Sequence, residues 1–172
     1  MRELLLFRHA KSSWDDPRLT DKERPLAARG RRAAAAMARS LAGLALVPDL
    51  VLCSGAKRAQ QTLDIANAEW SPAPDTRRID ALYGVMDSDY LAIVAGEGGS
   101  ARRLMLVGHN PAIQETALVL AGSGDPDLIA RVARKFPTAS VAVLMFDLED
   151  WSAITAGSGR FDAFLQPPRD QE

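Results

Sequence analysis

Short apolar segments alternate with longer helical patterns along the whole chain, and this alternation constrains the fold more than any other sequence feature. The segments Leu-Leu-Leu-Phe at 4–7 and Leu-Val-Leu-Cys at 50–53 contain no polar side chain. Strands that are apolar throughout are typical of parallel sheets covered by helices on both faces. The pattern therefore predicts an α/β fold, a three-layer α/β/α sandwich around a mostly parallel central sheet.

The same periodicities place the individual elements. Strands are predicted at residues 3–7, 50–53, 103–107 and 140–146, with weaker candidates at 77–79, 152–156 and 159–165. Helices are predicted at residues 28–44, 58–68, 88–95, 112–120 and 127–135. Segments 11–24 and 68–76 lack a regular period and are predicted to form surface loops.

Length and composition predict one domain. The chain has 172 residues, of which 47% are hydrophobic and 25% charged, as is typical of a single globular domain. No internal linker interrupts residues 1–166, which we expect to form this domain, and the polar, proline-containing residues 167–172 are expected to be a flexible tail.

Charge and hydropathy exclude several classes of partner. Lys and Arg total 21 against 22 Asp and Glu, a balance that does not attract nucleic acid nonspecifically. No segment approaches the roughly 18 apolar residues of a membrane span. The single cysteine, Cys53, excludes an internal disulfide bond. These features predict a cytoplasmic protein that binds neither nucleic acid nor membrane.

The chain contains two histidines, and each follows the end of an apolar strand. His9 follows Leu-Leu-Leu-Phe-Arg, and His109 follows Leu-Met-Leu-Val-Gly. Ligands of open α/β sheets bind beyond the carboxyl ends of the strands, so we expect both imidazoles at one site. A third strand leads through Ser54 into a helix that begins near Arg58. A helix N-terminus and a guanidinium together favour an anion.

Three segments in this order resemble the signature segments of the histidine phosphatase superfamily. They are Arg8-His9-Ala10, Ser54-x-Ala-x-Arg-Ala-x-Gln-Thr and Gly108-His109-Asn110-Pro111. The resemblance spans positions 8–111 and implies a phosphoglycerate mutase-like fold. Residues 8–14 and the Arg24-Pro25-Leu26 segment are similar to the bacterial phosphohistidine phosphatases of the SixA-like branch.

The resemblance implies roles for particular residues, and implies neither a metal ion nor a cofactor. His9 would be the nucleophile that takes up the phosphoryl group, Arg8, Arg58 and His109 would bind its oxygens, and Arg24 would lie near the pocket. A phosphoryl group in transfer carries its charge on three oxygens, so cationic donors suit it. We expect His9 to be neutral, His109 to be protonated, and the two to titrate as a coupled pair with a bell-shaped pH profile.

Asp80 is a candidate general acid. It stands three residues before the Tyr83-Gly84 pair, as a carboxylic acid does in the superfamily. An Asp at this position is equally compatible with capping a turn after a short strand. Imidazole leaves with little protonation, whereas an alkoxide needs a proton, so loss of Asp80 is expected to affect phosphoester cleavage more than phosphohistidine cleavage.

The resemblance predicts a phosphatase that acts on a phosphorylated protein carrier, of the phosphorelay or phosphotransferase-system type. A phosphatase of small phosphoesters with the same residues is an alternative. So is a noncatalytic module that binds a phosphoprotein, although binding alone does not require a nucleophilic imidazole. A metal-dependent hydrolase using both histidines with Asp15 and Asp16 would need more ligands than these comfortably supply.

Overall fold

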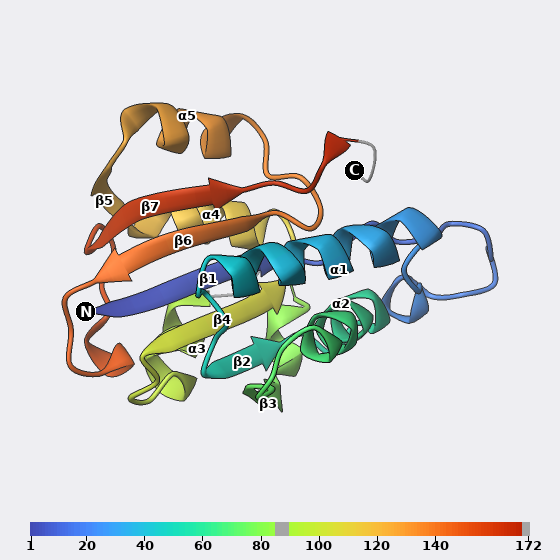
Figure 1. Ribbon diagram of the computed structural model, residues 1–172, viewed down its shortest axis with the longest axis horizontal. Coiled ribbons are helices and arrows are strands. Elements are labelled where there is room, and N and C mark those ends of the chain that lie inside the picture. Colours follow the sequence, from blue (N-terminus) through green and yellow to red (C-terminus); the bar gives the residue numbers. More distant parts are fainter. Residues whose placement is uncertain (85–89, 170–172) are drawn as a thin grey trace.

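The computed structural model describes residues 1–84 and 90–169, and within them a seven-stranded sheet forms the centre of the fold (Figure 1). The strand order is β3-β2-β4-β1-β6-β7-β5. The strands are β1 (Arg2–Arg8), β2 (Leu50–Cys53), β3 (Asp75–Arg78), β4 (Arg103–Gly108), β5 (Ala121–Gly124), β6 (Val141–Phe146) and β7 (Gly159–Leu165).

The sheet is mostly parallel, as predicted. Parallel ladders join β1 to β4, β4 to β2, β2 to β3 and β5 to β7. Strand β6 pairs antiparallel with both β1 and β7. The carboxyl ends of β1, β2 and β4 therefore lie side by side at one edge of the sheet, where the sequence placed the two histidines and Arg58.

Helices cover both faces of this sheet, which confirms the three-layer architecture. They are α1 (Ala28–Gly43), α2 (Lys57–Ala68), α3 (Tyr90–Glu97), α4 (Ala112–Leu120) and α5 (Pro126–Arg134). Alternate residues of β1 face opposite layers: Leu5 and Phe7 pack with α1 and α2, whereas Leu4 and Leu6 pack with α3 and α4. This alternation explains why the strand is apolar at every central position.

The predicted elements agree closely with the observed ones. Asp125 accepts a hydrogen bond from the Asp127 backbone N–H at the start of α5, and Pro126 occupies the first helical position. The first two residues of the helix predicted at 88–95 lie outside the described residues, as do residues 170–172 of the predicted tail. No helix in the described ranges is long and apolar enough to cross a membrane.

In the second half of the chain, one predicted strand is absent and one observed strand was not predicted. Residues 152–156 do not form a strand, because the Asp150 carboxylate accepts a hydrogen bond from the Ser152 backbone N–H and caps the short 3-10 helix Trp151–Ala153. Strand β5 was missed, since Ala-Gly-Ser-Gly carries no strand signal. Gly122 lies so close to the Gly157 carbonyl that a β-carbon would have no space.

Candidate active site

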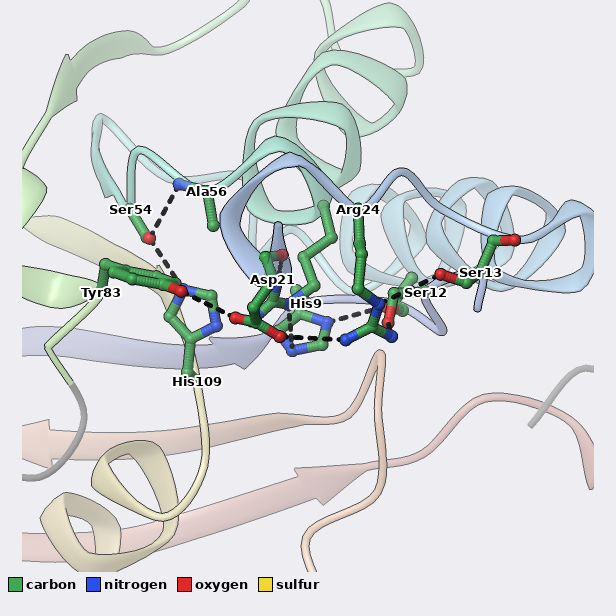
Figure 2. Close-up of polar contacts among 11 residues, drawn as sticks. His9, Ser12, Ser13, Asp21, Arg24, Ser54, Ala56, Tyr83 and His109 are labelled. Atoms are coloured by element: carbon green, nitrogen blue, oxygen red, sulfur yellow. Dashed lines mark hydrogen bonds and ion pairs between the residues drawn. The ribbon is translucent and has the colours of Figure 1, made fainter. Parts of the chain in front are cut away.

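A pocket of about 530 Å³ opens at the carboxyl ends of β1, β2 and β4. Its lining brings together residues from five separate segments of the chain, including Arg8, His9, Asp21, Arg24, Arg58, Tyr83 and His109. Five of the six residues proposed from the sequence therefore meet in one place. Figure 2 shows the polar contacts around His9, Asp21, Arg24 and His109.

His9 lies at the floor of the pocket with only 7% of its surface exposed. Its Nδ1 lies 2.7 Å from the Ala10 carbonyl oxygen, which can only accept a hydrogen bond, so Nδ1 carries the ring proton. The opposite nitrogen, Nε2, accepts a hydrogen bond from Arg58 Nε at 3.4 Å. The tautomer thus leaves a lone pair on Nε2, the form that a nucleophilic imidazole requires.

His109 lies beside His9, with the two ring centres 5.1 Å apart. Its Nε2 is 2.7 Å from Ser54 Oγ, which also accepts a hydrogen bond from the Ala56 backbone N–H. If the Ser54 hydroxyl donates to Nε2, the neutral ring carries its proton on Nδ1. Nδ1 is buried and has no partner in the described structure, so in that tautomer its proton can be donated to an anionic ligand.

The ionisation of His109 differs from the sequence prediction. Burial, followed by the positive charge of Arg58, lowers its pKa to about 4. Burial also lowers the pKa of His9 to about 3, opposed by the hydrogen bond to Ala10 and reinforced by His109 and Arg58. Both rings are therefore neutral at pH 7.

Acidification is expected to destabilise the fold between about pH 6.5 and pH 4. In this range the unfolded chain binds protons on both imidazoles, whereas the folded chain does not, so stability falls as pH falls. At pH 5 the loss is about 2 kcal/mol for each histidine. Urea unfolding at pH 7 and pH 5 measures it. The His109→Asn variant should lose less stability than the wild type, and equal losses would contradict the lowered pKa values.

Two arginines lie close to His9. Arg8, at the end of β1, donates from Nη1 to the Phe136 carbonyl oxygen at 2.7 Å, and its buried Nε has no partner in the described structure. Arg58, in the first turn of α2, is 7% exposed. Planar guanidinium groups offer several donors in a fixed geometry, which suits the oxygens of a phosphoryl group.

The residues that follow Arg58 hold the walls of the pocket. Thr62 Oγ1 donates to the Arg58 carbonyl oxygen one helical turn earlier and accepts from the Ala10 backbone N–H at 3.0 Å. Gln61 Oε1 accepts from the Leu26 backbone N–H at 2.8 Å. Gln61 and Thr62 therefore connect α2 to Leu26 and Ala10, which lie on either side of segment 11–24.

Segment 11–24, predicted to be a surface loop, lies mostly at the surface and also contributes to the pocket lining. Arg24 is 6% exposed and donates to Ser12 Oγ, to the Ser13 carbonyl oxygen and to Asp21. These bonds fold the loop back on itself, while Trp14 stacks over the Arg24 guanidinium and remains 73% exposed at the rim. Arg24 thus organises the rim of the pocket.

Sequence reasoning missed Asp21. Its carboxylate accepts hydrogen bonds from Arg58 at 3.0 Å, from Arg24 at 3.1 Å and from the Tyr83 hydroxyl at 2.7 Å. Partial burial opposes ionisation, but the hydrogen bonds from Tyr83 and Arg58 lower the pKa of Asp21 to about 2. The only sequence signal was its position three residues before Arg24 in an otherwise irregular segment.

Asp80 is the one proposed residue that the structure does not bring into the pocket lining. Its exposed carboxylate accepts a hydrogen bond from Arg78 Nε at 2.8 Å, and this contact lowers its pKa. The pair lies against Gly55, where a β-carbon would collide with the carboxylate oxygen. The general acid role therefore has no geometric support in this structure.

The described residues also contain no group of three or more His, Cys, Asp or Glu side chains arranged to hold a metal ion. The two histidines of the pocket instead face arginines, an environment that repels cations.

Comparisons with known proteins identify the family and the fold of this chain. The family model for the histidine phosphatase superfamily (branch 1) matches residues 4–86. An uncharacterized protein of Mycobacterium tuberculosis strain H37Rv is 36% identical over 163 residues, covering 94% of this chain and 99% of its own length. A proposed SixA phosphohistidine phosphatase from Nakamurella multipartitia has a similar structure, with a TM-score of 0.81, 30% identity and 96% of each chain covered. Another from Agrobacterium tumefaciens has a TM-score of 0.79 and 31% identity, covering 96% of this chain and 98% of its own.

Proposed function

Because the chain belongs to the histidine phosphatase superfamily, in its SixA-like branch, we propose that this phosphatase dephosphorylates phosphohistidine on a partner protein through a phosphohistidine intermediate at His9. The observation that carries the proposal is the state of His9. Its Nδ1–H is fixed on the Ala10 carbonyl, and its Nε2 lone pair faces the Arg58 guanidinium. A neutral imidazole beside two arginines can attack a phosphorus atom whose oxygens those arginines bind.

The proposed reaction consists of two successive displacements at phosphorus. In the first, His9 Nε2 forms a bond to phosphorus while the bond from phosphorus to the substrate nitrogen breaks, and its electron pair remains on the departing imidazole. In the second, water attacks phosphorus and the electron pair of the P–N bond returns to His9 Nε2. The products are histidine and inorganic phosphate, with the proton released by the attacking water passing to phosphate or solvent.

A substrate carried by a protein suits the mouth of this pocket. The Asp21 side chain belongs to the lining and yet is 51% exposed, so the site communicates directly with solvent. Trp14 stands at the rim, 73% exposed, where a macromolecule would contact it. These features support a phosphoryl group presented on a side chain, as opposed to a small metabolite enclosed by the protein.

The test is the turnover of a histidine-phosphorylated carrier protein beside p-nitrophenyl phosphate, both in the presence of a chelator. The proposal predicts rapid release of phosphate from the carrier, undiminished by chelation, with a kcat/KM at least 100-fold above that for the aryl phosphate. Preference for the aryl phosphate would assign the site to small phosphoesters, and loss of activity in chelator would contradict metal-independent catalysis.

A further inference from the structure

The pocket that would bind an anionic phosphoryl group contains a carboxylate in direct contact with its arginines. Asp21 Oδ2 lies 3.0 Å from Arg58 Nη2, and Asp21 Oδ1 lies 3.1 Å from Arg24 Nη1. A negative charge beside a bound phosphoryl group opposes its binding. Orienting Arg58 does not by itself require that charge, because the Asp21 backbone carbonyl also accepts a hydrogen bond from Arg58, at 2.7 Å.

The carboxylate retains capacity to accept a further hydrogen bond. Oδ2 accepts from both Tyr83 and Arg58, whereas Oδ1 accepts from Arg24 alone among the described residues. Each carboxylate oxygen can accept two hydrogen bonds, and the Asp21 side chain is 51% exposed. Oδ1 of this ionised group can therefore accept one further hydrogen bond, on a side chain that lines the pocket and is half exposed to solvent.

The contacts of His9 show what a phosphorylated imidazole needs. Once Nε2 carries the phosphoryl group, the ring is cationic, and its remaining N–H at Nδ1 is held by the Ala10 carbonyl oxygen. A substrate phosphohistidine contains the same chemical group, with its imidazole on the opposite side of the phosphoryl group from His9. Protonation of its second ring nitrogen lets it depart as neutral imidazole, and that N–H requires an acceptor on the entrance side of the pocket.

We propose that Asp21 determines leaving-group specificity: its carboxylate accepts the N–H of the protonated, unphosphorylated ring nitrogen of a substrate phosphohistidine. This inference rests on the proposed function and names the part of the substrate that the entrance recognises. The proton remains on the substrate ring throughout, so the P–N bond breaks to give neutral imidazole without proton transfer from the protein. An ester substrate offers no such N–H, and the same carboxylate repels the negative charge that develops on its departing oxygen.

The test compares Asp21→Asn with Asp15→Asn, which removes a charge from the same loop outside the pocket lining. The substrates are a short peptide with one phosphohistidine and p-nitrophenyl phosphate. We expect Asp21→Asn to lower the ratio of the two kcat/KM values, peptide over aryl phosphate, by tenfold or more. Asp15→Asn should change this ratio less than twofold.

A purely positioning role gives a different result. If Asp21 only orients Arg58, Asp21→Asn lowers kcat/KM for both substrates by the same factor and weakens inhibition by inorganic phosphate, which overturns the inference. An unchanged ratio with unchanged rates overturns it too. The wild-type enzyme tests the proposed function independently of Asp21. If that function is wrong, the wild-type kcat/KM will not be higher for the phosphohistidine peptide than for the aryl phosphate. Thermal unfolding of each variant identifies a loss of folded protein.

Discussion

His9→Ala should lower kcat/KM for phosphohistidine hydrolysis by about 10⁴-fold or more. Removing the imidazole removes the atom that would bond to phosphorus, and the side chains that would bind the phosphoryl oxygens do not replace it. The neighbouring His109 cannot substitute readily, because its Nε2 is engaged with Ser54 Oγ at 2.7 Å. The rate of phosphate release, measured under conditions in which substrate is limiting, reports kcat/KM directly.

The sequence supplies an unusually clean control for this experiment. The chain contains two histidines, so in His109→Ala the nucleophile candidate is the one histidine left. Rapid quenching of this variant with labelled substrate should trap an acid-labile phosphoryl group on His9, with slower turnover than in the wild type. His9→Ala should trap none. Labelling of His109 in the His9→Ala protein, or turnover within tenfold of the wild type, would assign the nucleophile elsewhere.

The fold was largely predictable because its strands are buried on both faces. Such strands are apolar at every central position, and β1, β2, β4 and β6 were all recognised on that basis. Strand β5 was not recognised, because it consists of small residues. One of them, Gly122, lies in close contact with the backbone at Gly157. A contact between residues distant in sequence leaves no periodic signal within the strand itself.

The candidate site likewise contains residues that the sequence predicts and one residue, Asp21, that it does not. His9, Arg58 and His109 follow strand ends or begin a helix, so parallel strand pairing brings them together. Asp21 begins the short 3-10 helix Asp21–Glu23, within a loop whose path depends on Arg24 and on the bridge between Ser12 and Leu26. The Ser12–Leu26 bridge and the contact between Asp21 and Arg58 join residues distant in sequence, so they are not visible in local sequence.

Arg58→Ala should lower kcat/KM by about 10²- to 10³-fold, the usual effect of removing one donor to a charged transition state. Arg58 Nε contacts His9 Nε2 directly at 3.4 Å, so the guanidinium lies beside the position that a phosphoryl group on Nε2 would take. Removing it also leaves Asp21 with fewer compensating charges. Phosphate inhibition should weaken together with catalysis, because the same donors bind product and transition state.

Arg58→Lys separates the charge from the planar geometry. A lysine restores the charge but cannot donate at once toward the His9 side and toward both Asp21 acceptors, contacts that Arg58 makes with three different nitrogens. We therefore expect Arg58→Lys to recover no more than about tenfold of the loss in Arg58→Ala. Arg39→Ala, on the exposed face of α1, removes a guanidinium paired with Glu69 and should leave kcat/KM unchanged. Full activity in Arg58→Lys would show that a positive charge suffices, and that the fixed geometry of the guanidinium contributes nothing to phosphoryl transfer.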